Sequence, residues 1–169
     1  MRINKGVEWA VHACTLLAPL PPGRGLSLGA LATYHGVPEP YMAKQMQALS
    51  KAGLVQTSRG KTGGYALAKA PDAISLWDIK VAIDGDTPAF RCTEIRQNGP
   101  CAVKAEDCVK ACPIAAAFAA AEAAYREALQ CVRLSDLVAS VSSGGDTAHM
   151  LDILRWYEGH VTDLPGGVL

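Results

Sequence analysis

Four cysteines between residues 92 and 112 are the most chemically suggestive residues of this sequence: Cys92, Cys101, Cys108 and Cys112. Their uneven spacing differs from the paired C-x2-C motifs of ordinary structural zinc sites. Cys112 directly precedes a proline, as the last ligand often does in bacterial ferredoxin motifs. The loop therefore predicts a metal or iron–sulfur site. Free buried thiols and a redox disulfide are the alternatives.

A second candidate group lies near the N-terminus. Glu8 and His12 are four residues apart in an otherwise apolar segment, so a helix places them on one face. A carboxylate and a neutral imidazole are both metal ligands, and histidine replaces cysteine on the iron of some clusters. The pair therefore predicts ligation, and the alternative is an ordinary hydrogen-bonded surface pair. Trp9 is adjacent to Glu8 in the sequence.

The elements that position these groups follow from apolar periodicity. Apolar residues recur at helical spacing after Asn4, a plausible N-cap, until Pro19 ends the pattern. After a Pro/Gly loop at residues 21–25, helices are predicted for residues 28–35 and 41–51, joined by a tight turn. Two short helices around such a turn predict a helix-turn-helix motif.

A small β-hairpin follows this motif. Residues 54–57 and 65–67 read as short strands joined by a glycine-rich segment, and residues 75–83 as a further capped helix. The fold class is therefore mainly α with a small β-hairpin wing, and residues 1–86 form a winged helix-turn-helix domain.

The rest of the chain divides into three parts. Residues 87–112 form the cysteine loop, and residues 113–141 contain a long alanine-rich helix followed by a second amphipathic helix. The apolar stripe of the long helix is longer than one small domain needs for its own core. Residues 142–169 form an acidic, helical C-terminal tail without an assigned role. Cys14 and Cys131 lie beside apolar residues and are expected to pack.

Charge is unevenly distributed along the chain. The totals balance at 16 basic and 16 acidic residues, yet the segment 41–69 carries five basic residues and no acidic one. A basic face on a helix-turn-helix with a wing is suited to DNA phosphates and the major groove, whereas the alternative is a solvated basic face. Lys44 and Gln47 on the second helix are the side chains best placed to contact base edges. Arg59 and Lys61 at the tip of the wing can enter the minor groove or hold phosphate.

The composition excludes several classes of protein. The 169 residues are half apolar and only 19 % charged, which excludes a disordered chain and a histone-like protein. Glu8 and His12 interrupt the first apolar run, which argues against a signal peptide, and no uncharged segment reaches the roughly 20 residues of a membrane span. We therefore expect a cytoplasmic protein with reduced thiols and no membrane partner.

Residues 1 to about 141 resemble the Rrf-type family of winged-helix iron–sulfur transcription regulators, which includes IscR, NsrR and RsrR. The specific segments are residues 41–46 (YMAKQM), 52–55 (AGLV) and 59–65 (RGKTGGY), followed by a cysteine loop before a long helix. The resemblance implies a homodimer joined through the long helix, with double-stranded DNA as its partner.

The combination of Glu8, Trp9 and His12 with Cys92 and Cys112 resembles the redox-sensing RsrR-like branch of this family. It implies a 2Fe–2S cluster held by Glu8 and His12 of one chain and by Cys92 and Cys112 of the partner subunit. As a hypothesis, Trp9 changes rotamer with the charge of the cluster and so acts as a redox relay to the winged helix. The oxidation state of the cluster would then control binding to a pseudo-palindromic operator.

Three alternatives compete with this function. A regulator of the same fold with an all-cysteine or 4Fe–4S site would sense nitric oxide or iron–sulfur status. An iron–sulfur electron-transfer protein leaves the basic helix and the wing unexplained, and a zinc- or thiol-based repressor would be colourless. No enzyme is predicted, because the sequence shows neither a nucleophile–base constellation nor a phosphate-binding glycine loop.

Overall fold

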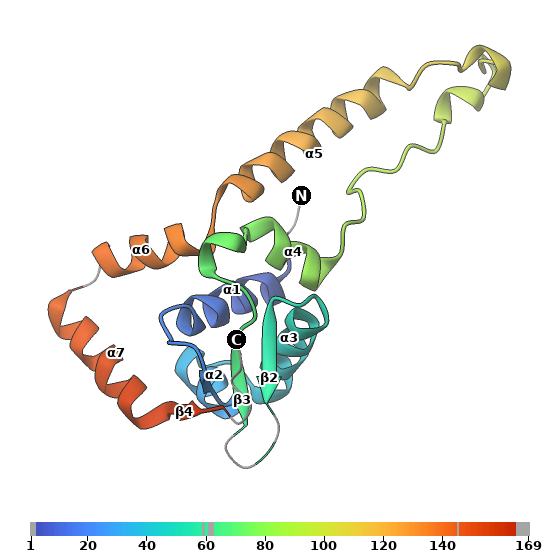
Figure 1. Ribbon diagram of the computed structural model, residues 1–169. Helices are drawn as coiled ribbons and strands as arrows, with labels where there is room; N and C mark the ends of the chain where they lie inside the picture. The colour runs from blue at the N-terminus through green and yellow to red at the C-terminus, as the bar shows by residue number, and fades with distance from the viewer. Residues whose placement is uncertain (1–2, 59, 61–62, 145, 165–169) are drawn as a thin grey trace.

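The computed structural model describes residues 3–58, 60, 63–144 and 146–164. Its N-terminal half is built around three helices, α1 (Lys5–Leu17), α2 (Leu28–His35) and α3 (Glu39–Lys51) (Figure 1). The predicted caps are confirmed: the side chain of Asn4 accepts the N–H of Gly6, and Ser27 accepts that of Ala30. Helix α3 begins two residues earlier than predicted, because the ring of a proline is tolerated in the first helical turn.

The buried face of α3 packs across α1. Met42, Met46 and Leu49 are fully buried, which confirms the face predicted to be apolar. Gln45 is also buried and lies against Gly6, where an added Cβ would come within 2.7 Å of the amide oxygen of Gln45. The small residue therefore permits the close crossing of the two helices.

An antiparallel sheet lies beside this helical core. Its strands are β1 (Arg24–Leu26), β2 (Val55–Ser58), β3 (Gly64–Leu67) and β4 (Val161–Asp163), in the order β2-β3-β1-β4. The hairpin β2–β3 confirms the predicted wing. β1 lies partly where a loop was predicted, and β4 ends a tail predicted to be helical. Both are three-residue strands that depend on partners distant in the sequence.

The wing connects to helix α4 (Leu76–Asp84) through a short 3₁₀ turn at Pro71–Ala73. The side chain of Ser75 accepts the N–H of Asp78, whose carboxylate in turn accepts the N–H of Ser75, which confirms the predicted capped helix. The cysteine loop follows, with 3₁₀ turns at Ile95–Gln97 and Ala105–Asp107.

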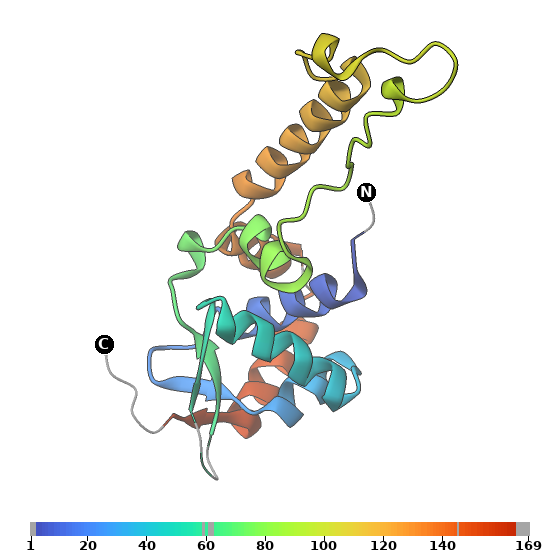
Figure 2. The same ribbon diagram turned by 90° about the vertical axis from the view of Figure 1, so that its right-hand side faces the viewer.

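Helix α5 (Pro113–Cys131) projects away from the body of the chain (Figures 1 and 2). Its C-terminal half is held by α4: the ring of Tyr125 lies edge-on to that of Trp77, and Arg126 lies over the same indole and pairs with Asp86 at 2.8 Å. No residue of α5 is buried in the single chain. Cys131, at its end, is exposed, in contrast to the predicted packing role.

The C-terminal segment turns back onto the N-terminal half. Helix α6 (Leu134–Gly144) leads to α7 (Thr147–His160), where the ring of Trp156 packs edge-on against Tyr34 with centroids 4.6 Å apart. The hydroxyl of Tyr157 donates to the carbonyl of Leu16 at 2.7 Å. Strand β4 then pairs with β1, so the tail completes the sheet. None of the described helices is long and apolar enough to cross a bilayer.

Candidate functional site

The exposed side of α3 and the wing form one open groove. Lys44 and Gln47 lie on this side of α3, opposite its buried methionines, and Thr57 and Tyr65 of the hairpin line the other wall. The structure therefore places two of the predicted DNA-contacting residues together. The other two, Arg59 and Lys61, lie outside the described residues.

Tyr41, in the first turn of α3, is exposed and contacts Trp9 of α1. The two rings meet edge to face, with centroids 5.9 Å apart. Sequence reasoning did not single out Tyr41, although an exposed aromatic residue at the start of a recognition helix is itself a signal. The contact joins the candidate ligand segment of α1 to the DNA-facing helix.

Glu8 and His12 lie on the exposed side of α1. The structure contains no hydrogen bond between these two side chains, so the hydrogen-bonded surface pair considered above is not formed. Both side chains border an apolar pocket of about 290 Å³ between α1, α4, α5 and α6, with Val11, Tyr125 and Leu129 in its wall. The carboxylate of Glu8 and the imidazole of His12 are therefore free to bind a ligand at the edge of this apolar pocket.

His35 is a residue near this site that sequence reasoning missed. Its ring lies 5.5 Å from that of His12, measured between centroids, and its buried Nε2 has no hydrogen-bond partner. Burial lowers the pKa of His35, and the positive charge of a protonated His12 lowers it further. A second imidazole, that of His35, therefore lies next to a predicted ligand.

The cysteine loop begins by following α5. The ring of Phe90 stacks on that of Phe118 with centroids 4.4 Å apart, and the N–H of Ala89 donates to the carboxylate of Glu122 at 3.1 Å. These contacts hold the residues just before Cys92 against the projecting half of α5. At the other end of the loop, Cys112 is the residue that precedes α5.

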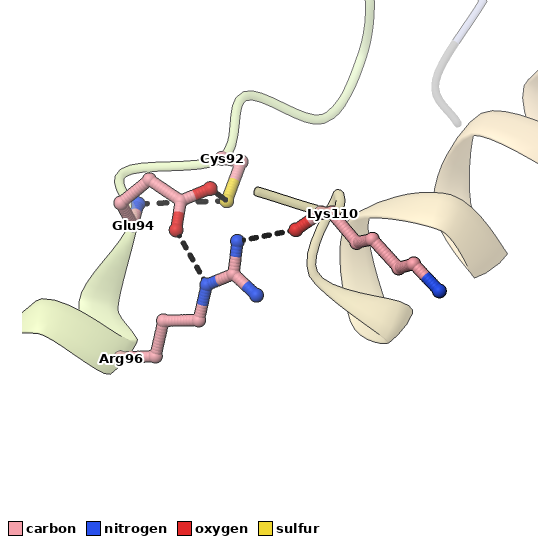
Figure 3. A network of polar contacts seen from close by, with 4 residues as sticks. All are labelled: Cys92, Glu94, Arg96 and Lys110. Atoms are coloured by element: carbon pink, nitrogen blue, oxygen red, sulfur yellow. Dashed lines mark hydrogen bonds and ion pairs between the residues drawn. The ribbon is translucent and has the colours of Figure 1, made fainter. Parts of the chain in front are cut away.

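Polar contacts join the two ends of this loop (Figure 3). Arg96 pairs with Glu94 at 2.7 Å and donates to the carbonyl of Lys110, also at 2.7 Å. The backbone N–H of Glu94 in turn donates to Sγ of Cys92. The hydrogen bond to Arg96 lowers the pKa of the Glu94 carboxyl. The charged residues between the cysteines were a signal for this network that sequence reasoning did not use.

The four predicted ligands are not brought together within one chain. Tyr125 lies at the pocket beside Glu8 and His12, whereas Cys112 lies thirteen residues earlier on the same axis, about 20 Å away at 1.5 Å per residue. Figures 1 and 2 both show the cysteine loop running from α4 out to the far end of α5, so that its last part lies away from α1. Within the described ranges, no group of three His, Cys, Asp or Glu side chains is placed to hold a metal ion.

A helix-turn-helix whose second helix shares a basic groove with a β-hairpin defines the winged helix-turn-helix class of DNA-binding proteins. The chain belongs to the Rrf2 family, described as iron-dependent transcriptional regulators, whose sequence pattern matches residues 3–140. It is thus a DNA-binding transcriptional regulator and not an enzyme. The matched range ends before α7 and β4.

Named relatives support this family. A protein of Aquifex aeolicus (strain VF5), named as an HTH-type transcriptional regulator, is 37 % identical over 111 residues, which cover 61 % of this chain and 75 % of the relative. An rrf2-like regulator of Rhodobacter capsulatus is 30 % identical over 131 residues, covering 76 % of this chain and 83 % of the relative.

Solved structures support the fold. CymR of B. subtilis, the global cysteine regulator, superposes with a TM-score of 0.66 at 24 % identity, covering 83 % of this chain and 98 % of CymR. IscR of T. potens superposes with a TM-score of 0.63 at 22 % identity, covering 89 % of this chain and 96 % of IscR. The mainly helical architecture with a small antiparallel sheet is therefore that of the winged-helix regulators of this family.

Proposed function

We propose that this protein is a homodimeric regulator that senses redox state through a 2Fe–2S cluster at each of two shared sites. Glu8 and His12 of one chain and Cys92 and Cys112 of the partner subunit would hold the cluster. The separation of these residues within one chain carries the proposal: a carboxylate and an imidazole are exposed at the body, and two thiols lie at the far end of α5.

The exposure of α5 supports the dimer. Ile114 and Phe118 are 61 % and 50 % exposed on a helix with no buried residue, an arrangement that leaves apolar side chains for another surface to cover. A second copy whose cysteine loop reaches α1 would cover this stripe and complete both ligand sets. In a closed twofold dimer, each chain gives the same residues to the other.

The chemistry of the donors fits such a cluster. Thiolates are the usual ligands of 2Fe–2S clusters, and an imidazole replaces a thiolate in some of them. His12 and Glu8 are exposed and have no hydrogen bond to each other, so neither must break that contact to become a ligand. When bound, the cluster supplies a one-electron redox couple whose potential depends on its ligands and on hydrogen bonds to sulfur.

The contact between Trp9 and Tyr41 supports a route from this site to DNA. Trp9 is adjacent to Glu8 and touches the first turn of the recognition helix. A change in charge at Glu8 and His12 that shifts the indole would bias the position of α3. Two states of α3 with different affinities are what a redox-controlled regulator requires. A dimer of winged helices would read a pseudo-palindromic operator with half-sites one or two turns apart, at about 10 base pairs per turn.

Subunit mixing tests the shared site. One variant carries Glu8→Ala and His12→Ala, and the other carries Cys92→Ser and Cys112→Ser. Each homodimer lacks half of every ligand set and should fail to load a cluster during anaerobic reconstitution. The mixed dimer retains one complete site, so iron content and the spin-half signal after reduction should return to half of the wild-type amount per dimer.

The outcomes of this experiment are distinct. If all ligands came from one chain, no mixed dimer would load a cluster. If the Glu8→Ala, His12→Ala homodimer loaded a cluster by itself, the all-cysteine alternative using Cys101 or Cys108 would replace the proposed set. Separate tags on the two chains identify the mixed dimer, and its absorbance before reduction distinguishes iron–sulfur from colourless zinc.

A further inference from the structure

The two ends of the cysteine loop are joined by one side chain. Glu94 lies two residues after Cys92, and Lys110 lies two residues before Cys112. Arg96 binds both: its Nε donates to Glu94 Oε2 at 2.7 Å, and its Nη2 donates to the carbonyl of Lys110 at 2.7 Å (Figure 3). A guanidinium is suited to this role because its donors are fixed in one plane and point in separate directions.

The backbone at Glu94 is held in an uncommon conformation. Its φ is +51°, the only positive value at a non-glycine residue in the described ranges. Such backbone persists where surrounding contacts over-determine it, and it concentrates at functional sites. In this conformation Glu94 contacts the thiol of Cys92 with two of its groups. Its backbone N–H donates to Sγ, with 3.4 Å between N and Sγ, and its carboxylate Oε1 accepts from Sγ at 3.6 Å.

Arg96 is also close enough to the cysteines at the other end of the loop to interact with their charges. The hydrogen bond with Glu94 is the largest cause that raises the pKa of Arg96, and the thiols of Cys108 and Cys112 add to it when ionised. Its backbone carbonyl accepts the N–H of Val103, so the middle of the loop is attached to the same residue.

We infer that Arg96 is a positioning residue that holds Cys92 and Cys112 ready to bind the cluster. Its charge, together with the N–H donated by Glu94 to Cys92, would raise the reduction potential, because both favour the more negative reduced state. The inference about the potential rests on the proposed function. The inference about the position of the two thiols does not, because the contacts exist without a cluster.

Crosslinking in the apo-protein tests the positioning. In a background with Cys101, Cys108 and Cys131 changed to serine, a short bismaleimide joins Cys92 to Cys112 within one chain, and mass spectrometry quantifies this product. Arg96→Ala should slow its formation by about threefold or more, because the two ends lose their common anchor. Arg91→Ala, in the same loop and exposed, should leave the rate unchanged. Equal rates in all three proteins would overturn the positioning role.

Arg96→Lys separates position from charge. Lysine keeps the cation but lacks the planar fork, so the crosslinking rate should remain low while the midpoint potential of the loaded protein returns toward that of the wild type. Arg96→Ala should have a more negative potential than both. An unchanged potential in Arg96→Ala would disprove the electrostatic role. If no variant or wild-type protein binds a cluster, the proposed function fails, and the crosslinking rates still decide the positioning role.

Discussion

The indole of Trp9 lies edge-on to the ring of Tyr41, with centroids 5.9 Å apart, and this contact joins the candidate ligand segment of α1 to the first turn of the recognition helix. Aromatic pairs of this kind contribute about 0.5–1.5 kcal/mol beyond their burial. In the proposed relay, this contact would couple the two sites by a free energy of about this size.

Trp9→Ala should weaken the proposed redox control of DNA binding. The ratio of the DNA affinities of the oxidised and reduced proteins should fall by about two- to tenfold, the equivalent of one lost aromatic contact. Fluorescence anisotropy at fixed salt, with an operator selected from random duplexes, measures this ratio. Trp9→Phe keeps an aromatic ring and is the control. An unaltered affinity ratio in Trp9→Ala would disprove the hypothesis that Trp9 acts as the relay.

Lys44 and Gln47 should affect DNA binding differently. Lys44→Ala should weaken binding and reduce the salt dependence by about one counterion, because it removes a cation as well as a candidate base contact. Gln47→Ala should cost about 1–3 kcal/mol at one base position and relax specificity there. Lys69, which is exposed but outside the groove of α3 and the wing, provides the control Lys69→Ala. If Lys69→Ala lost as much DNA affinity as Lys44→Ala, the basic segment would act only as a nonspecific phosphate-binding surface.

Tyr157→Phe should destabilise the fold through one hydrogen bond. The hydroxyl donates to the carbonyl of Leu16 in a partly buried site, and burial raises the pKa of Tyr157. Its loss should cost about 0.5–1.5 kcal/mol and lower the Tm by about 2–4 °C for each kcal/mol. Thermal unfolding of the apo-protein measures this, with Tyr125→Phe as the control. A Tm equal to that of the wild type would mean that α7 contributes no stability through this bond.

Cys14 should not react with alkylating agents in the folded apo-protein. Burial raises the pKa of its thiol to about 12, so at pH 8 only about one molecule in ten thousand carries the reactive thiolate. Exposed Cys92 and Cys101 should be labelled by iodoacetamide first, as mass spectrometry of peptides can show. Labelling of Cys14 at the rate of Cys101 under native conditions would contradict its burial.

Ala121→Glu should dissociate the proposed dimer. Ala121 is exposed on the apolar stripe of α5, where a carboxylate would be unpaired in the contact between two chains. An unpaired charge buried in this way costs about 3–5 kcal/mol, so the dissociation constant should rise by about two orders of magnitude or more. Gln130→Glu adds the same charge on the opposite face and should leave the dimer intact. Analytical ultracentrifugation distinguishes the two, and a dimeric Ala121→Glu would place the interface elsewhere.

Local patterns were sufficient to predict the helices and the wing. The spacing of Met42, Met46 and Leu49 predicted the buried face of α3, and the glycine-rich segment predicted the hairpin, because each of these signals depends on neighbours within a few residues. The caps at Asn4 and Ser27 depend on equally short distances. The ligand and DNA-contacting roles of the candidate residues remain predictions.

The tertiary structure decided what distant segments do to one another. Strand β4 pairs with β1 across more than a hundred residues, and nothing local in a three-residue strand predicts its partner. The direction of α5 separates Cys112 from Glu8 and His12, and the contacts of Arg96 join the ends of a loop with no periodic pattern. The sequence by itself determined residue chemistry and local structure through short-range backbone and apolar preferences, whereas packing between remote elements decided which of these groups meet.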